Sequence, residues 1–167
     1  MATNVTSNLN YLQPTSFKLV IDRENYPNLE YFCQNFTHPG MIINSVEVPF
    51  RKIAGVPFIG NSLTFNELNA TIILDEDMTA YNEMYSWIRR VVDTSDVRAI
   101  DRNSTRIPTY SDITLSILSS QNNQSKQVKY HECAPVSLGD IVFESTATGT
   151  EFVTFGVAIR FTYVEFI

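Results

Sequence analysis

The chain has 167 residues, of which 44% are hydrophobic and 12% aromatic, which is typical of one globular domain with a filled core. Its formal net charge of -6 argues against a protein that grips a nucleic-acid backbone, because such binding needs clustered Lys and Arg. No apolar run approaches the ~20 residues of a membrane helix, and the first residues lack the basic and apolar segments of a secretion signal, so we expect no membrane insertion and synthesis in a cytoplasm.

The early part of the sequence predicts strands. Ser16 to Asp22 has apolar side chains at alternate positions, namely Phe17, Leu19 and Ile21. A turn is expected at Tyr26 to Asn28, followed by a second strand that starts at Leu29 and ends before the His-Pro-Gly at positions 38–40. Met41 to Phe50 is again extended, with one mainly apolar face and one mixed face.

The segment from Arg51 to Asn61 is more apolar than a solvated loop should be. Its apolar side chains stand between turn-forming Gly and Pro residues and are Ile53, Val56, Phe58 and Ile59. Either this loop folds over its own core, or it is a projecting hairpin that buries these side chains only against a neighbouring molecule. A strand from Leu63 to Leu74, apolar on both faces, follows.

One amphipathic helix is predicted, from Asp75 to Asp93. Its apolar stripe recurs at three- and four-residue spacing through Tyr81, Met84, Tyr85, Ile88, Val91 and Val92. Acidic residues at its start and arginines at its end suit the helix dipole, which is a sufficient explanation for them, although the acids also fit a docking site for a partner. Asp75 and Asp77 have no nucleophile or base at a catalytic spacing.

The second half of the chain predicts a polar connection and then more strands. Thr94 to Thr109 lacks periodicity and indicates a long connection. Tyr110 to Ser120 and Gln127 to Cys133 predict a hairpin. Pro135 to Gly139 is expected to break the pattern.

Two further strands are predicted near the end of the sequence. Asp140 to Glu144 indicates a short strand, and Ser145 to Thr150 a polar turn. Val153 to Tyr163 has the strongest alternation in the chain and predicts one long final strand.

Cysteines and histidines give no indication of a catalytic or metal site. Cys33 and Cys133 lack the paired spacing of a zinc site and are expected to be reduced thiols. His38 and His131 have no Ser/His/Asp spacing around them. We therefore expect no catalytic residues, no metal and no cofactor.

These elements predict a mainly β fold, an antiparallel β-sandwich or barrel with one packed α-helix. Such a domain leaves open sheet edges, which are an aggregation risk unless other chains complete the pairing. A closed ring of subunits linked by head-to-tail contacts would cover them.

The order of these features resembles the major tail tube protein of contractile-tailed, T4-type bacteriophages, over nearly everything after the N-terminal arm. Three stretches carry the resemblance. Pro39-Gly40 stands between two strands that lead into the projecting hairpin; Phe65 to Asp77 leads into a helix with Tyr81, Tyr85 and Trp87; and Cys133 to Ile141 contains a Pro-x-x-x-Gly turn before the closing strand 152–163.

This resemblance implies hexameric rings that stack into a tube inside a contractile sheath, with DNA passing through the lumen. It implies a single tail-tube domain over 1–167, with an N-terminal arm at 1–15, a projecting hairpin at 48–66 and a helix at 75–93. The hairpin contacts expected between rings are Ile53, Val56, Phe58 and Ile59. The contacts expected with the sheath are Asp75, Glu76, Asp77 and Glu83.

The implied partners are further copies of the chain, the tail sheath protein, the baseplate and tail-terminator proteins, the tape measure protein and, transiently, DNA. The implied location is the tail tube of the virion, assembled in the host cytoplasm. Alternatives are a tube subunit of a related contractile secretion or injection system, a baseplate tube initiator, or a monomeric ligand-binding β-barrel. An enzyme is not expected.

Overall fold

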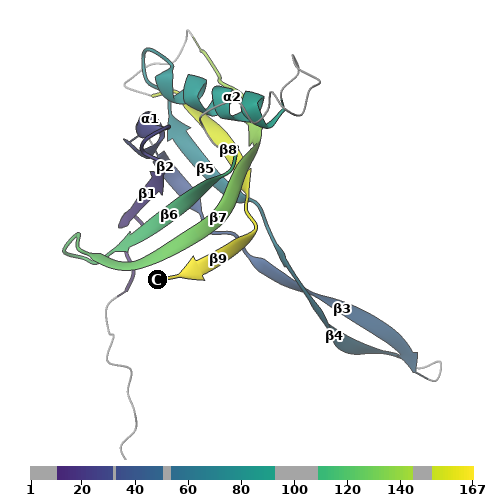
Figure 1. Ribbon diagram of the computed structural model, residues 1–167. Coiled ribbons are helices and arrows are strands. Elements are labelled where there is room, and N and C mark those ends of the chain that lie inside the picture. Colours follow the sequence, from purple (N-terminus) through teal and green to yellow (C-terminus); the bar gives the residue numbers. More distant parts are fainter. Residues whose placement is uncertain (1–10, 32, 51–53, 93–108, 145–151) are drawn as a thin grey trace, which may run out of the picture.

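The chain folds into a curled β body, a helix across one end of it and a long hairpin that leaves it (Figure 1). The computed structural model describes residues 11–31, 33–50, 54–92, 109–144 and 152–167. Its elements are β1 (Phe17–Ile21), α1 (Pro27–Tyr31), β2 (Cys33–Thr37), β3 (Met41–Phe50), β4 (Ala54–Phe65), β5 (Leu68–Ile73), α2 (Thr79–Val91), β6 (Ser111–Leu118), β7 (Gln124–Leu138), β8 (Thr154–Arg160) and β9 (Tyr163–Phe166). The predicted mainly β, antiparallel class is confirmed, and neither described helix is long and apolar enough to cross a membrane.

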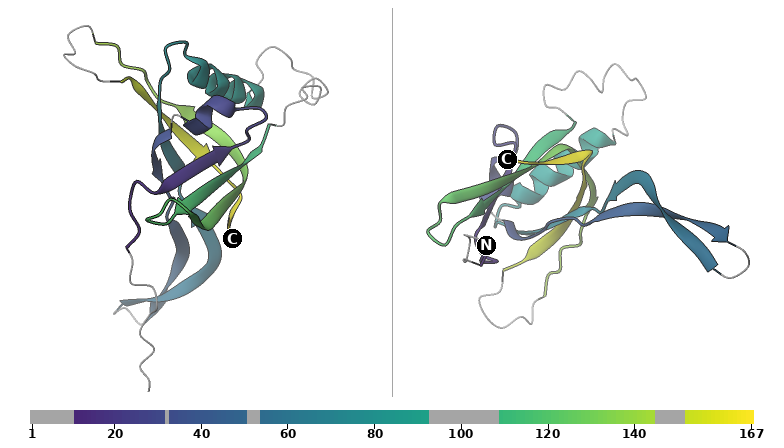
Figure 2. Two further views of the ribbon diagram at one scale, coloured as in Figure 1. Left: turned by 90° about the vertical axis from the view of Figure 1, so that its left-hand side faces the viewer. Right: turned by 90° about the horizontal axis from the view of Figure 1, so that it is seen from below.

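The body is one antiparallel sheet with strand order β1-β6-β7-β8-β5-β2, to which β9 adds beside β7. It wraps around a core, and α2 lies across one end of it (Figure 2). The longest strand, β7, has three partners. Its first half pairs with β6 and with β9, and its second half pairs with β8. Between these halves lies Glu132, whose φ of 55° is left-handed, so the strand changes partner at a local irregularity.

Alternate residues of the strands form the core, as their period of two requires. The buried side chains of the sheet include Leu19, Ile21, Ile113, Leu115, Val128, Tyr130, Phe155, Val157 and Ile159. The helix α2 adds Ala80, Met84 and Trp87, all with no exposed area. Each such large apolar side chain contributes about 1.5 to 3 kcal/mol relative to an exposed one.

Helix α2 begins at Thr79, four residues after the predicted start at Asp75. Met78, the residue before it, is left-handed with a φ of 54°, and its side chain makes no capping bond. The Asp75 carboxylate caps the helix in its place, accepting from the amides of Thr79 at 2.9 Å and Ala80 at 3.1 Å. Desolvation of Asp75 disfavours its charge, but these hydrogen bonds outweigh that effect and hold its pKa below the ordinary value.

The buried stripe of α2 differs from the predicted one. Tyr85 and Val92 are exposed, at 46% and 58%, whereas Trp87, which was outside the predicted stripe, is completely buried. The Trp87 Nε1–H donates to the carbonyl of Thr109 at 2.8 Å, so the indole also holds the end of the segment that enters β6. Tyr81 does pack inward, edge-on against Phe155 at 5.3 Å.

Two predicted boundaries in the first half are wrong. Leu29, expected to start a strand, lies in the short helix α1, because its side chain is buried against the core there. The strand predicted from Leu63 to Leu74 is two strands, β4 and β5, with Asn66 and Glu67 between them. The Asn66 amide donates to the Gly40 carbonyl at 3.0 Å at this point.

Two predictions in the second half are also wrong. Residues 140–144 form no strand, and β7 instead continues to Leu138 through Pro135, which lies opposite Ile159. The long final strand is divided at Thr162, whose amide donates to the His131 carbonyl at 3.0 Å and whose hydroxyl donates to Glu132 at 2.7 Å. The β6/β7 hairpin is confirmed. The polar turn at 145–150 and nearly all of the connection at 94–109 lie outside the described residues.

Candidate assembly surfaces

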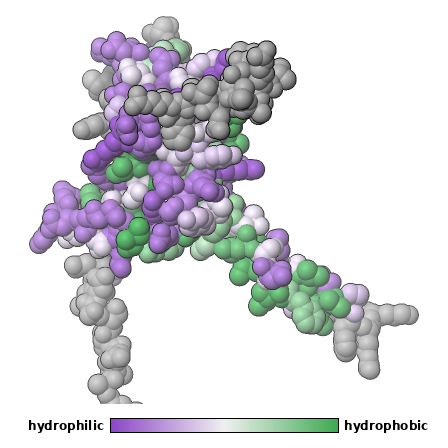
Figure 3. All heavy atoms as spheres, viewed as in Figure 1, coloured by the Kyte–Doolittle hydropathy of each residue, from purple (hydrophilic) through white to green (hydrophobic). Residues whose placement is uncertain are grey.

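The β3/β4 hairpin exposes apolar side chains far from the core. Among the described strands, these two pair only with each other, and they project away from the body (Figure 1). Figure 3 shows hydrophobic residues over much of the visible surface of the hairpin. The large apolar residues exposed on it are Met41, Ile42, Ile43, Val46, Val48, Val56, Phe58, Ile59 and Leu63. A two-stranded ribbon is marginal alone in water, so this surface is typical of one that another molecule covers.

The register gives the outer part of the hairpin two unlike faces. Val46 lies opposite Phe58, and Val48 lies opposite Val56, so these four side chains share one face, which we call the distal patch. On the other face the pairs are Ser45 with Ile59, Glu47 with Pro57 and Pro49 with Gly55. Only the distal patch is wholly apolar.

A bulge separates the outer hairpin from its base. Ile43 pairs with Leu63 and Ser45 with Ile59, so Asn44 faces three residues of β4, and its Nδ2 donates to Ser62 at 3.1 Å. A Cβ added at Gly60 would lie 2.1 Å from the Asn44 carbonyl oxygen, so this position requires glycine. At the base, Phe65 packs on Phe161 at 5.2 Å, which ties the hairpin to the body.

Three of the four predicted inter-ring residues are exposed on the described part of the hairpin. Val56, Phe58 and Ile59 are exposed at 40%, 57% and 86%, although Ile59 is on the face opposite the other two. Ile53 lies outside the described residues. The hairpin itself starts at Met41, earlier than the predicted 48, because β3 and β4 stay paired down to Met41 and Phe65. The role of these residues between rings stays a prediction.

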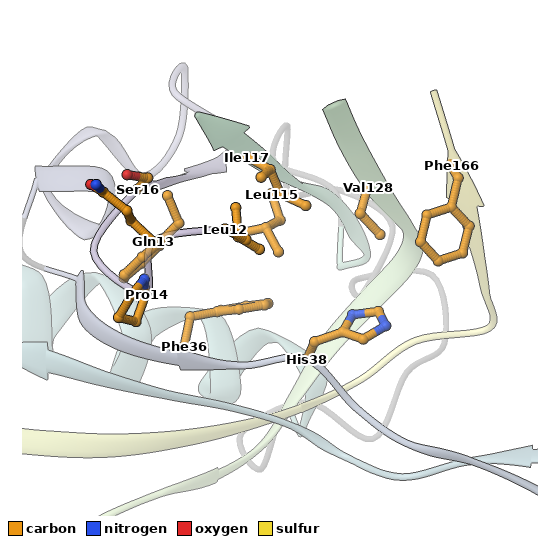
Figure 4. A pocket seen from close by; sticks show the side chains of 11 residues that line it. Leu12, Gln13, Pro14, Ser16, Phe36, His38, Leu115, Ile117, Val128 and Phe166 are labelled. Carbon is orange, nitrogen blue, oxygen red and sulfur yellow. The ribbon is translucent and has the colours of Figure 1, made fainter. Parts of the chain in front are cut away.

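The body contributes open edges and an apolar pocket. The sheet ends at β1 and β2, and in the described residues no pairing joins these two strands. A pocket of about 310 Å³ lies by these edges. Figure 4 shows Phe36 and His38 on one side of it, Leu115, Ile117 and Val128 from β6 and β7, Phe166 from β9, and Leu12 to Pro14 from the segment before β1. Sequence periodicity missed this pocket because it is built from five separate segments.

The four acidic residues predicted to contact the sheath differ in their surroundings. Asp75 caps α2, and Glu83 accepts from the Asn28 side chain at 2.6 Å and from its amide at 3.3 Å, which links α2 to α1. Glu76 and Asp77 are exposed in the turn before α2. Their contact with a sheath stays a prediction.

The cysteines and histidines occupy structural positions. The two thiols are not bonded to each other, and burial raises the pKa of Cys33 to about 11 and that of Cys133 to about 12. His131 lies between Asp112 at 3.4 Å and Glu165 at 3.2 Å, so it links β7 with β6 and β9. His38 contacts the Tyr130 hydroxyl at 2.5 Å. Among the described residues, no group of three or more acidic, His or Cys side chains is arranged to hold a metal.

Comparison with known proteins gives one family match and several similar solved structures. The family model for "Phage tail tube protein" matches residues 3–167. Among solved structures, the chain resembles the tube-terminating cap of the anti-feeding prophage, with 14% identity, a TM-score of 0.65 and 99% of each chain covered. It also resembles a chain of the anti-feeding prophage baseplate, with 9% identity, a TM-score of 0.60 and 90% of each chain covered.

A third similar structure is a chain of the PVC extracellular contractile injection system sheath-tube complex in its extended state. The identity is 14% and the TM-score 0.55, and the match covers 95% of this chain and 93% of that one. No curated protein sequence matches the chain. The structural likenesses establish the fold, whereas the family match spans almost the whole sequence. The chain belongs to the phage tail tube protein family, and it is a structural subunit of such a tube.

Proposed function

We propose that this chain forms hexameric rings that stack into the inner tube of a contractile tail, and that the β3/β4 hairpin makes the contact between rings. The observation that carries the proposal is the apolar surface of the hairpin, which the other described residues of the chain leave exposed. The hairpin residues proposed for the contact are Ile53, Val56, Phe58 and Ile59. The similar anti-feeding prophage baseplate structure is 6-fold symmetrised, which supports a hexameric ring for this chain.

The tube surrounds a channel for DNA and ends at baseplate and terminator proteins, with the tape measure protein in its lumen. These partners come from the resemblance to T4-type tails, and the similar cap, baseplate and sheath-tube structures support the general arrangement. The chain has no catalytic role in this proposal. It is assembled in the host cytoplasm and resides in the virion tail. A tube in a related injection system is the second candidate, favoured by the likeness to the sheath-tube complex.

The proposed sheath contact is the acidic start of α2, formed by Asp75, Glu76, Asp77 and Glu83. Glu76 and Asp77 carry the surface charge, since both are exposed and neither has a partner among the described residues. Exposed ion pairs are worth only ~0.2 to 1 kcal/mol each, which suits a contact that must release on contraction. Reversal of both charges to Lys is expected to impair sheath assembly on preformed tubes, and normal sheathing would contradict this contact.

Electron microscopy of the purified chain tests the assembly. We expect rings or stacked tubes from the natural sequence. Phe58→Asp should abolish stacking, because it places a charge in the distal patch, whereas Val142→Asp, at a residue of 72% exposure outside the hairpin, should not. A chain that remains monomeric at high concentration would contradict the proposal.

A further inference from the structure

The apolar pocket by the β1 and β2 edges and the distal patch of the hairpin have matching chemistry. The pocket is lined mainly by apolar side chains, with Phe36 and Phe166 on opposite sides of it (Figure 4). It is open to solvent at its rim, where Leu12 is 65% and Phe166 is 65% exposed. An open apolar pocket of about 310 Å³ offers room for a cluster of side chains of this kind.

The hairpin cannot fill the pocket of its own chain. Figures 1 and 2 show it projecting away from the body, and its base is held by the Phe65–Phe161 contact. The two complementary surfaces can therefore meet only between different copies. Because each copy carries both surfaces, such a contact is head-to-tail and repeats from one copy to the next.

We propose that the distal patch, Val46, Val48, Val56 and Phe58, docks on the pocket of a neighbouring copy, with Phe58 as its central anchor. This inference rests on the proposed function, which has the hairpin contacting another ring, and adds the surface that receives it. The opposite hairpin face fits less well, because its docking would remove the Glu47 carboxylate and the Ser45 hydroxyl from water against a mainly apolar wall.

The position of the pocket explains why a strand-like partner suits it. The adjacent strands β1 and β2 end the sheet, so they carry backbone groups without a strand partner among the described residues. A ribbon that reaches the pocket brings its own backbone near those edges. Side-chain burial and edge covering then occur in a single contact.

Disulfide trapping tests the contact in assembled tubes. Phe58→Cys combined with Phe166→Cys is expected to give a ladder of covalent multimers under mild oxidation. Glu47→Cys combined with Phe166→Cys is the matched control, because residue 47 is exposed on the opposite face of the ribbon. The natural Cys33 and Cys133 are left in place, since the pKa values of about 11 and 12 keep them protonated at neutral pH.

A second measurement does not depend on disulfide geometry. Leu12→Asp places a charge at the pocket rim and should raise the concentration needed for tube formation by about tenfold or more. Its neighbour Tyr11, at 96% exposure, does not line this pocket, so Tyr11→Asp should have little effect.

The outcomes separate this inference from the proposed function. A ladder from the Phe58→Cys pair that is absent or much weaker for the Glu47→Cys pair, together with the Leu12→Asp effect, supports docking on the pocket. Tubes that form, require Phe58 and yet give no such ladder and tolerate Leu12→Asp would overturn the docking site while leaving hairpin-mediated stacking intact. Equal ladders from both faces would also overturn it. A chain that forms no tubes at all would contradict the proposed function.

Discussion

The phenol ring of Tyr26 stacks on the indole ring of Trp87, with ring centroids 4.8 Å apart and planes inclined by 19°. Arg90 lies over the same phenol, 5.4 Å from its centroid, and donates to the Tyr26 hydroxyl. This stack joins the segment between β1 and α1 to helix α2, and the Trp87 bond to Thr109 extends the connection to the start of β6. The helix is therefore fixed to the body from two sides.

Replacement of Trp87 tests this connection. Trp87→Phe keeps an aromatic ring but removes the N–H donor, and should cost about 1 kcal/mol of unfolding free energy. Trp87→Ala also leaves a cavity and should cost about 3 to 5 kcal/mol. Urea unfolding in a Phe58→Asp background, in which stacking is blocked, measures both. Tyr85→Phe on the exposed face of α2 is the control and should change stability by less than about 0.5 kcal/mol. Equal losses of stability at positions 85 and 87 would contradict the role of Trp87 in fixing α2 to the body.

Removal of the Asp75 cap should destabilise α2. Asp75→Ala is expected to cost about 1 kcal/mol, because the amides of Thr79 and Ala80 lose their acceptor. Asp77→Ala, in the same exposed turn, should be close to neutral. Circular dichroism during urea unfolding compares the two. If Asp75 served only a partner contact, its removal would leave the stability of the isolated chain unchanged.

The cap also predicts a pH dependence. The folded-state pKa of Asp75 is below its ordinary value of 3.8, so its contribution is fully present above that value and is lost as the pH falls through the lower, folded-state pKa. The stability difference between the natural chain and Asp75→Ala should therefore be constant at neutral pH and should shrink under strong acid. A difference that grew on acidification would contradict the capping role.

Alanine at the hairpin bulge should affect assembly and spare the body. Gly60→Ala forces the Asn44 carbonyl and the new Cβ apart, which shifts the hairpin that carries the distal patch. We expect the concentration for tube formation to rise several-fold, measured by sedimentation. Body stability should change little, since β3 and β4 pair with no other strand in the described part of the chain. Gly55→Ala is the matched control in the same hairpin, because its nearest contact, at 3.2 Å, is the movable end of the Glu47 side chain. Equal assembly defects in both variants would contradict this account.

The two thiols should resist modification in the folded chain. Burial raises the pKa of both Cys33 and Cys133, which lowers the fraction of reactive thiolate at neutral pH. A colorimetric thiol reagent at pH 7.5 should therefore react slowly with the native chain and rapidly with 2 thiols per chain in denaturant. Fast reaction of the native chain at Cys33, the less buried of the two, would show that its surroundings open readily.

Sequence periodicity predicted the elements that follow one regular pattern. Leu19 and Ile21 alternate because one face of β1 is buried, and the apolar content of the hairpin is visible in Val56 and Phe58 without any structure. It failed where the structure depends on a distant partner. β8 and β9 are divided because they pair with different halves of β7, and Thr162 carries no local signal for this division.

Pairing with a distant strand also overrides the local sequence signal at Pro135. Pro135 was expected to end a strand, but pairing with Ile159 keeps it in β7. Trp87 was missed for a different reason: the buried stripe Ala80, Met84 and Trp87 has regular helical spacing, but the prediction placed the stripe on a neighbouring side of the helix. Exposure of the hairpin residues followed from composition, whereas the pocket required five segments to meet, which no single periodicity encodes.

The hairpin and the body share a continuous ribbon. β2 leads into β3 and β4 leads into β5. The backbone hydrogen bond between Gly40 and Asn66 joins these two segments where they leave the body. A pull along the hairpin therefore reaches β2 and β5 together, since both continue into it, and loads the ladder between β5 and β8 in shear, with many hydrogen bonds stressed at once. Such an arrangement resists tension far better than one in which bonds open singly. If hairpins link successive subunits, a sudden axial pull on the tube is therefore carried by the β-sheet of each body as well as by the hairpins.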